Sequence, residues 1–335
     1  MRSRRALTVL LSLAAAVAAV PSTASAGGSE SSPVVSELAS FAAPGCTSGC
    51  GSGSTIGPDG ALYVTDGPAG RVLRVDPDTG AMTTFAHGLP PATPAVGIGG
   101  AMDVAFVDGT AYVLVTLVGP SFGQPDVVDG IYLIGKDGTP TAIADIGAWS
   151  IAHPPETDFF VDSGVQYALE ELDGDLLVSD GHHNRVLRVT RSGDISQMIA
   201  FGNIVPTGLE VRHGTIYMGE AGPIPHLPQN GKVVRFTPTS AATDVAAGAS
   251  LIVDVEFGPC SALYALSQGV WDLPVTPENE GAPASPNTGR LVRVLDDGSF
   301  GSVVGGLDRP TSLEFVGRTA FVVTLTGKVM KIEKA

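Results

Sequence analysis

Residues 176–189 read LLVSDGHHNRVLRV, and residues 62–75 repeat the same plan as LYVTDGPAGRVLRV. In both stretches a short apolar run leads into a turn, and the turn leads into a second run in which the apolar positions alternate. Alternation with a period of two is typical of β-strands, and the intervening turn joins two of them into a hairpin. This repeated hairpin decides the fold.

The second strand of the hairpin recurs six times along the chain. Its copies begin at Gly70, Gly130, Asn184, Gly231, Gly289 and Gly327. The apolar strands that precede these copies follow one another at spacings of 49, 65, 40, 47 and 57 residues. Units of about 40–50 residues that cannot bury both faces alone are typical of β-propellers. We therefore predict an all-β fold, a six-bladed β-propeller with four-stranded antiparallel blades.

The last blade is one strand short. Strands are predicted at residues 311–315, 320–325 and 328–333, after which the chain stops. The segment Val34–Phe41 has strand character and precedes the first blade's own strands. We expect it to complete the last blade, since this closure would leave no open sheet edge.

The N-terminus has the organisation of a bacterial signal peptide. Basic Arg2, Arg4 and Arg5 precede an apolar run, and small residues end at Ala26. An exported protein is expected, secreted to the extracellular side, with the choice between the Sec and twin-arginine routes left open. The predicted parts of the chain are a signal peptide at 1–26, a short linker at 27–33 and the propeller at 34–335.

Composition narrows the range of partners. The chain is 44% apolar and only 16% charged, it contains 43 Gly and 25 Pro, and its formal net charge is −15. Since the signal peptide contributes Arg residues and no acid, the mature chain is more acidic still. Such a surface repels phosphate, which argues against nucleic acid and anionic membranes. We expect a monomer without membrane insertion whose partner is a small molecule or another exported protein.

The long connections fall on one face of the predicted ring. They lie at about 116–129, 147–164, 219–230 and 267–288, whereas the turns on the opposite face are short. Loops that lengthen on one side of a rigid scaffold usually carry the function. The candidate ligand-binding residues on this face are Trp149, His153, Phe159, Phe160, His182, His183, Glu220, His226 and Trp271.

Aromatic and His side chains around a funnel indicate an apolar or aromatic ligand. The alternative is that a Trp or Phe in a long loop folds back to anchor that loop. The adjacent His182 and His183 could act in acid–base chemistry or bind a metal, or else Asn184 supplies turn geometry while His182 stacks on the rim. No catalytic residue can be assigned.

Asp66, Asp180 and Glu220 end the second strand of three blades. They could converge on a divalent cation, or accept hydrogen bonds from the turns that follow. The inner segment of the first blade, residues 51–56, offers no carboxylate or amide ligand. We therefore assign no metal ligands, and the cofactor remains unknown.

Three cysteines occur, at positions 46, 50 and 260. Cys46 and Cys50 precede the first blade on the loop-bearing side, whereas Cys260 lies in a turn on the opposite side. The distance between the two faces of the propeller exceeds what a disulfide can span. We predict a Cys46–Cys50 bridge and an unpaired Cys260.

Several segments resemble one family. Residues 205–208 (VPTG), 214–220 (GTIYMGE) and 231–235 (GKVVR) look like the fourth blade of the ScyD/ScyE family of secreted NHL-like propellers, and 253–259 (VDVEFGP) fits its fifth blade. The pair His182–His183 departs from the small residues usual there. The resemblance implies an exported propeller, sometimes associated with the assembly of aromatic metabolites, but it transfers no catalytic set.

The function predicted from the sequence is binding of a small apolar or aromatic molecule, or of an exported partner, through the loop-rich face. The alternative is a metal-assisted lyase or lactonase of the propeller type that uses His182, His183, His226 and Glu220. Whether the protein is an enzyme stays open.

Overall fold

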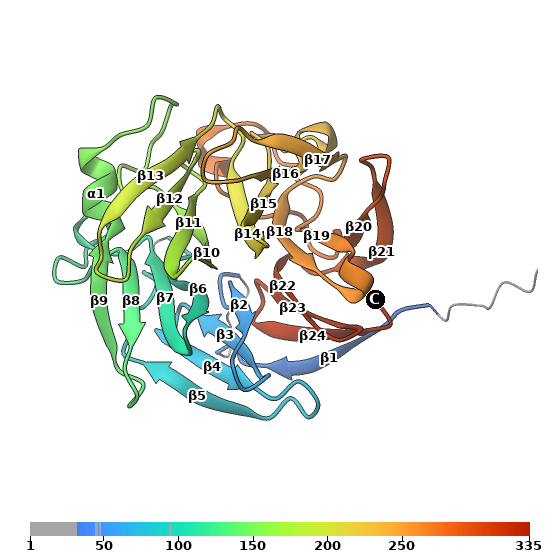
Figure 1. Cartoon of the computed structure of the whole chain (residues 1–335), viewed down its shortest axis with the longest axis horizontal. Helices are drawn as coiled ribbons and strands as arrows, with labels where there is room; N and C mark the ends of the chain where they lie inside the picture. Colours follow the sequence, from blue (N-terminus) through green and yellow to red (C-terminus); the bar gives the residue numbers. More distant parts are fainter. Residues whose placement is uncertain (1–31, 44–45, 47, 94–95) are drawn as a thin grey trace, which may run out of the picture. The chain divides into compact units, whose positions relative to one another are not determined.

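The computed structural model describes residues 32–43, 46, 48–93 and 96–335. The predicted signal peptide and nearly all of the predicted linker lie outside these residues. Six four-stranded antiparallel sheets are arranged around a common axis, which confirms the predicted six-bladed β-propeller (Figure 1).

The first three blades follow one another along the chain, and in each the first strand is innermost. Blade one consists of β2 (Ser54–Ile56), β3 (Leu62–Asp66), β4 (Arg71–Val75) and β5 (Met82–His87). Blade two consists of β6 (Gly100–Val107), β7 (Thr110–Thr116), β8 (Gly130–Ile134) and β9 (Pro140–Asp145). Blade three consists of β10 (Gln166–Leu172), β11 (Asp175–Asp180), β12 (Arg185–Val189) and β13 (Ile195–Ala200).

The remaining blades repeat this order, except that the last takes its outer strand from the N-terminal side. Blade four consists of β14 (Pro206–Arg212), β15 (Thr215–Glu220), β16 (Lys232–Phe236) and β17 (Thr243–Ala247). Blade five consists of β18 (Ile252–Phe257), β19 (Leu263–Ser267), β20 (Gly289–Val294) and β21 (Phe300–Leu307). Blade six consists of β22 (Pro310–Val316), β23 (Thr319–Thr324), β24 (Lys328–Glu333) and β1 (Val34–Ser40).

Strand β1 pairs antiparallel with β24, with a register that runs from Val34 opposite Glu333 to Ser40 opposite Lys328. It is the outermost strand of this sheet (Figure 1). The first and last segments of the propeller are therefore hydrogen-bonded to each other.

The apolar core is divided among the interfaces between blades. In β11, Leu176 and Val178 belong to the cluster shared with blade two, whereas Leu177, between them, belongs to the cluster shared with blade four. Alternate side chains thus pack on opposite neighbours, so both faces of a blade are apolar. This explains why the repeated strands are rich in Val and Leu at successive positions.

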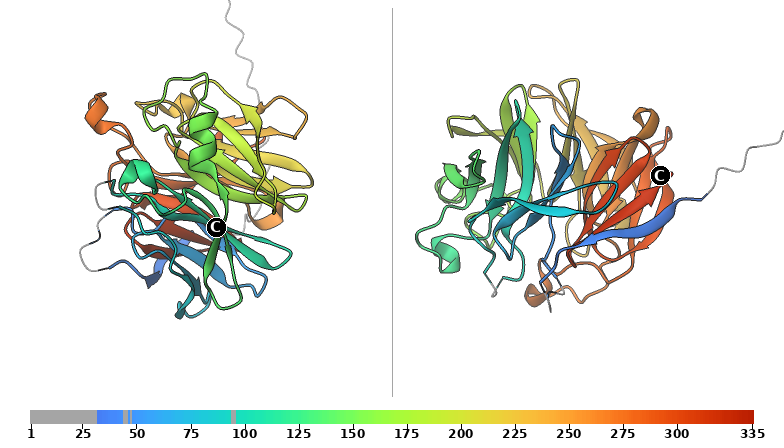
Figure 2. Two further views of the ribbon diagram at one scale, coloured as in Figure 1. Left: turned by 90° about the vertical axis from the view of Figure 1, so that its left-hand side faces the viewer. Right: turned by 90° about the horizontal axis from the view of Figure 1, so that it is seen from below.

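The described part of the chain also contains one α-helix, α1 (Ile146–Ala152), which the sequence did not predict. Asp145 caps it, because its carboxylate accepts a hydrogen bond from the backbone N–H of Ala148 at 2.8 Å. The helix lies at the periphery of the ring, in the connection between blades two and three (Figures 1 and 2). Short 3-10 turns interrupt other connections, at Pro120–Phe122, Pro228–Asn230, Pro259–Ser261 and Pro277–Asn279.

Cys46 and Cys50 form a disulfide, with their Cα atoms 6.1 Å apart, and Cys260 is free and exposed. Both predictions about the cysteines are confirmed. Among the described residues, no helix is long and apolar enough to cross a membrane.

Candidate ligand-binding cavity

A cavity of about 1100 Å³ lies on the axis of the ring. Its lining includes residues of all six inner strands and of the long connections, among them Phe159, Ile224 and Val275. It therefore reaches from the middle of the propeller to the loop-bearing face. Phe160 and Val275, two of its apolar rim residues, are about two thirds exposed, at 64% and 65%.

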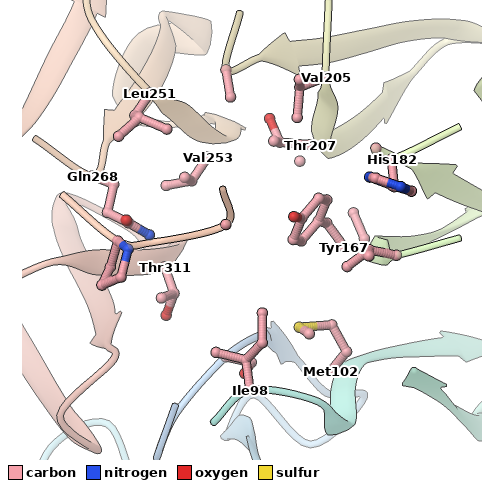
Figure 3. A pocket seen from close by; sticks show the side chains of 18 of the residues that line it. Ile98, Met102, Tyr167, His182, Val205, Thr207, Leu251, Val253, Gln268 and Thr311 are labelled. Atoms are coloured by element: carbon pink, nitrogen blue, oxygen red, sulfur yellow. The ribbon is translucent and has the colours of Figure 1, made fainter. Parts of the chain in front are cut away.

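The walls of the cavity are largely apolar and come from several blades. In Figure 3, Ile98 and Met102 lie on one side, while Leu251 and Val253 lie on another. Single polar side chains stand between them, from Tyr167, His182, Thr207, Gln268 and Thr311. An apolar cavity with a few polar groups is the usual form of a small-molecule site.

Tyr167, on β10, directs its hydroxyl toward the middle of the cavity (Figure 3). Its ring lies against Gly181, where a Cβ atom would collide with it. Burial raises the pKa of this phenol to about 12. Tyr167 therefore remains protonated at neutral pH and can donate a hydrogen bond to a ligand.

His182 lines the cavity beside Tyr167 (Figure 3). Its Nε2 accepts hydrogen bonds from the backbone N–H groups of Phe160 and Val161, at 2.9 and 3.0 Å. Nε2 must then be unprotonated, and burial together with the neighbouring His183 lowers the pKa of His182. His182 therefore fixes the Phe160 loop and keeps its Nδ1–H as a donor. The Phe160 ring stands edge-on to it, with centroids 4.3 Å apart.

His183, the second residue of the pair, does not line the cavity. It is 1% exposed, its Nε2 lies 3.0 Å from the carbonyl oxygen of Val161, and its Nδ1 lies 2.9 Å from a guanidinium nitrogen of Arg185. Asn184 adopts a left-handed conformation, with φ +55°, and its side-chain oxygen accepts hydrogen bonds from Ile204 and Val205. These contacts agree with the interpretation in which Asn184 shapes the turn, rather than with a chemical role for both histidines.

Trp149 and His153 also lie away from the cavity lining. Their rings stack at 4.3 Å, and the guanidinium of the buried Arg185 lies 5.0 Å from the Trp149 centroid. Arg185 further donates to Asp180 at 3.1 Å and to the carbonyl oxygen of His153 at 2.7 Å. This cluster ties α1 and the following loop to blade three.

His226 lines the cavity from the blade-four loop, and its Nδ1–H donates to the carbonyl oxygen of Gly222 at 2.7 Å. Burial lowers its pKa, so the neutral ring keeps Nε2 as an acceptor. Its ring lies edge-on to Trp271, with centroids 5.9 Å apart. Trp271 itself is 6% exposed, does not line the cavity and donates through its indole N–H to Ala282 at 3.1 Å.

The carboxylates at the ends of the second strands do not converge. Asp66 pairs with Arg71 at 2.7 Å and Asp180 with Arg185, and each also accepts from the backbone of its own turn. Glu220 is buried outside the cavity lining, and burial raises its pKa to about 7. Within the part of the chain that the structure describes, no three His, Cys, Asp or Glu residues are placed to hold a metal ion.

Of the predicted site residues, the structure brings together Phe159, Phe160, His182 and His226 at the cavity. The acidic residues of the inner strands, which also line it, were missed. Three of them, Glu170, Glu256 and Glu314, follow an apolar residue just before the turn to the second strand, and Glu210 occupies the same position in blade four outside the lining. That repeated apolar–Glu pair was visible in the sequence.

The fold and this axial cavity define the protein as a six-bladed propeller of the kind found in several bacterial proteins. Virginiamycin B lyase from Staphylococcus aureus is similar at a TM-score of 0.53 and 16% identity, covering 90% of this chain and 99% of its own. A gluconolactonase from Xanthomonas campestris is similar at a TM-score of 0.59 and 10% identity, covering 90% and 89%.

An aldose sugar dehydrogenase from Streptomyces coelicolor is similar at a TM-score of 0.57 and 14% identity, covering 90% of this chain and 98% of its own. At these identities the likeness extends to the fold alone. No protein-family model matches the sequence. No curated protein matches it either.

Proposed function

We propose that this protein is an exported propeller that binds a small, largely apolar molecule in its axial cavity, entered from the loop-bearing face. The observation that carries the proposal is the cavity itself, about 1100 Å³ in volume, whose lining combines apolar side chains with polar and acidic ones. This volume slightly exceeds the range of about 300–1,000 Å³ usual for small-molecule sites.

The rim of the cavity supports binding because contacts within the protein hold it in place. His182 fixes the loop that carries Phe159 and Phe160, and the Arg185 cluster fixes the same connection from the other side. A preformed site loses less conformational entropy on binding. In this proposal Phe159 and Phe160 contact the apolar part of the ligand, while Tyr167 and His182 donate hydrogen bonds to it.

Export and membership of the ScyD/ScyE family are parts of the same proposal. The Cys46–Cys50 disulfide supports export, since disulfides persist in oxidising compartments. The family resemblance favours an aromatic metabolite as ligand.

Titration with the neutral fluorophore N-phenylnaphthylamine tests this function. We expect saturable binding that Val253→Phe, a change that narrows the cavity, weakens about tenfold or more. Val316→Phe, on an exposed residue outside the lining, is the control and should bind as the parent does. Absence of saturable binding, or equal binding by both variants, would contradict the proposal.

An enzyme remains the second candidate, because the similar structures include proteins named as a lyase, a gluconolactonase and a sugar dehydrogenase. Any turnover by such a site would have to use cavity groups such as Tyr167, His182 and His226. Chemical conversion of a bound ligand, followed by mass spectrometry, distinguishes this candidate from simple binding.

A further inference from the structure

Four blades carry an arginine at the same register position of the third strand, namely Arg74, Arg188, Arg235 and Arg293. In blades one and three this arginine has an acidic partner, because Arg74 donates to Asp59 at 2.6 Å and Arg188 donates to Asp175 at 2.7 Å. In the described part of the chain, no ion pair involves Arg235 or Arg293. The neighbouring blades four and five thus each carry this arginine without its acid.

Blade one shows how the acid is held where it is present. The carboxylate of Asp59 accepts from the Arg74 guanidinium at 2.6 Å and from the hydroxyl of Tyr63 at 3.3 Å. Tyr63 lies opposite Arg74 in the sheet. Tyr217 lies opposite Arg235 in the same way, but the turn of blade four, His213–Gly214, contains no acid. Blade four therefore has the two residue types that hold a carboxylate in blade one, without the carboxylate.

Blade five has lost the acid by replacement within a turn of the same length. Residues 57–61 read GPDGA and residues 258–262 read GPCSA, and each turn joins the last paired residues of its two strands. Cys260 thus occupies the position of Asp59. Arg293 lies opposite Tyr264, as Arg74 lies opposite Tyr63, yet the carboxylate that would pair with it is absent.

Both arginines without an acid line one cleft of about 360 Å³, here called the arginine cleft. It lies between blades four and five, which are neighbours in the ring (Figure 1), and shares no lining residue with the axial cavity. The remaining lining residues are Tyr217, Val245, Phe257, Cys260, Ser261, Ala262, Leu263, Val294, Leu295 and Asp296.

The arginine cleft is basic although the chain as a whole has a net charge of −15. Arg212 adds a third positive charge at its edge, since it donates to the Ser261 hydroxyl at 2.7 Å and its guanidinium lies 4.4 Å from the Phe257 ring centroid. Asp296 is the only acid among the described lining residues; it is exposed, and no ion pair joins it to an arginine. The cleft therefore attracts anions.

The shape and walls of the cleft narrow the class of anion. The planar guanidinium group matches the geometry of a carboxylate and can bind it with two parallel hydrogen bonds. The Tyr217 and Phe257 rings meet edge-on with centroids 5.0 Å apart, and Val245, Leu263 and Leu295 add further apolar surface. The volume lies within the range of about 300–1,000 Å³ usual for small-molecule sites.

We propose that the arginine cleft is a second binding site, for a small carboxylic acid with an apolar body. Its carboxylate takes the place that Asp59 has in blade one, held by Arg235, Arg293 and the Tyr217 hydroxyl, and its apolar body lies on the walls of the cleft. This site is on the face of the short turns and is independent of the function proposed for the axial cavity.

Cys260 provides a native probe, because it is free, exposed and part of the cleft lining. Its reaction with dithiobis(nitrobenzoate), whose two rings carry carboxylates, is compared with its reaction with neutral dithiodipyridine. In each reaction the thiolate attacks the disulfide and one aromatic thiolate leaves, which is followed by absorbance. Arg235→Gln/Arg293→Gln should slow the first reaction about tenfold relative to the second. Arg188→Gln, at the matched position of blade three, is the control and should change neither rate.

Competition on the parent protein tests binding without a covalent step. Benzoate should slow the reaction of Cys260 with dithiodipyridine in a saturable manner at constant ionic strength. Neutral benzamide, and acetate, which has the charge but no ring, should each require about tenfold higher concentrations for the same protection. The double variant should lose the protection by benzoate.

Each outcome decides one part of the assignment. Equal slowing of both reagents in the double variant, or protection by benzamide as strong as that by benzoate, would overturn the carboxylate site. Acetate that protects as well as benzoate would refute the apolar part of the ligand. Thermal melting shows whether the double variant is folded, and the competition on the parent protein decides the question if it is not. None of these results bears on ligand binding in the axial cavity.

Discussion

At the scale of single residues, one residue type takes different roles according to the contacts it makes. His182 and His183 are adjacent, yet only His182 faces the cavity, and its Nε2 is already occupied by two backbone N–H groups. Trp271 and Phe160 both belong to long loops. Phe160 is 64% exposed at the rim, whereas Trp271 is buried and hydrogen-bonded to Ala282. Residue type alone therefore could not separate ligand contacts from loop anchors.

Trp271→Ala should destabilise the protein more than it weakens ligand binding. The indole is packed against Ala221, Leu251 and Ala284, and its removal leaves a cavity. We expect a loss of about 3 kcal/mol in the free energy of unfolding, measured by denaturant titration, with an intact affinity for N-phenylnaphthylamine. Val270→Ala, at the exposed neighbouring position, serves as the control. A stable variant with weakened binding would assign Trp271 to the ligand site.

At the scale of elements, each blade is an incomplete unit. Its two apolar faces are buried only by the blades on either side, as the alternation of Leu176, Leu177 and Val178 between two clusters demonstrates. Blade six also requires a strand from the opposite end of the sequence, because β1 pairs with β24. The closing strand is therefore the element that completes the last blade and joins the two ends of the propeller.

Deletion of Val34–Ser40 should leave the hydrogen-bonding edge of β24 open. Exposed edges pair with other chains, so we expect aggregation and a melting temperature lowered by about 5 °C or more. Size-exclusion chromatography and calorimetry measure the two effects. A chain that begins at Ser32 is the control. A truncated monomer that melts like this control would refute the role of β1.

At the scale of the whole molecule, the ring brings together acidic side chains from four sequence-distant strands. Glu170, Glu210, Glu256 and Glu314 are separated by dozens of residues, yet each pKa is raised by burial and by the other acids. The carboxyl groups of Asp103 and Asp254 lie among these glutamates and add to the mutual repulsion. Burial raises the pKa of Asp254 to about 7. The protonation state of these carboxyl groups is thus a property of the assembled ring.

The free energy of unfolding should fall as pH rises from about 5 to about 7.5. In this range the unfolded glutamates lose their protons, whereas the raised pKa values in the folded ring delay that loss, so the folded state binds more protons. The melting temperature should fall as the pH rises through this range. Glu314→Gln should reduce that fall and raise the melting temperature at the highest pH. Glu280→Gln, which removes an exposed charge at the mouth of the cavity, should leave the fall unchanged. A melting temperature that is constant or rises with pH would count against raised pKa values at the four inner-strand glutamates.

The sequence by itself determined the class of fold and the disulfide. The hairpin repeat is local, and its apolar positions report directly on which strands are buried, so blade number and strand order follow from it. Cys46 and Cys50 are close along the chain, and the strand pattern separates Cys260 from them. The apolar–Glu pairs of the inner strands could have been found in the same way, since they recur at a fixed position in the repeat.

Only the tertiary structure decided which side chains share the cavity. Trp149, His153, His183, Glu220 and Trp271 are in or next to the long connections, but they lie outside the cavity lining. The direction of a loop side chain depends on contacts with distant segments, as between Arg185 and His153. Those contacts form when the blades close into a ring, so a pattern read along one strand at a time does not contain them.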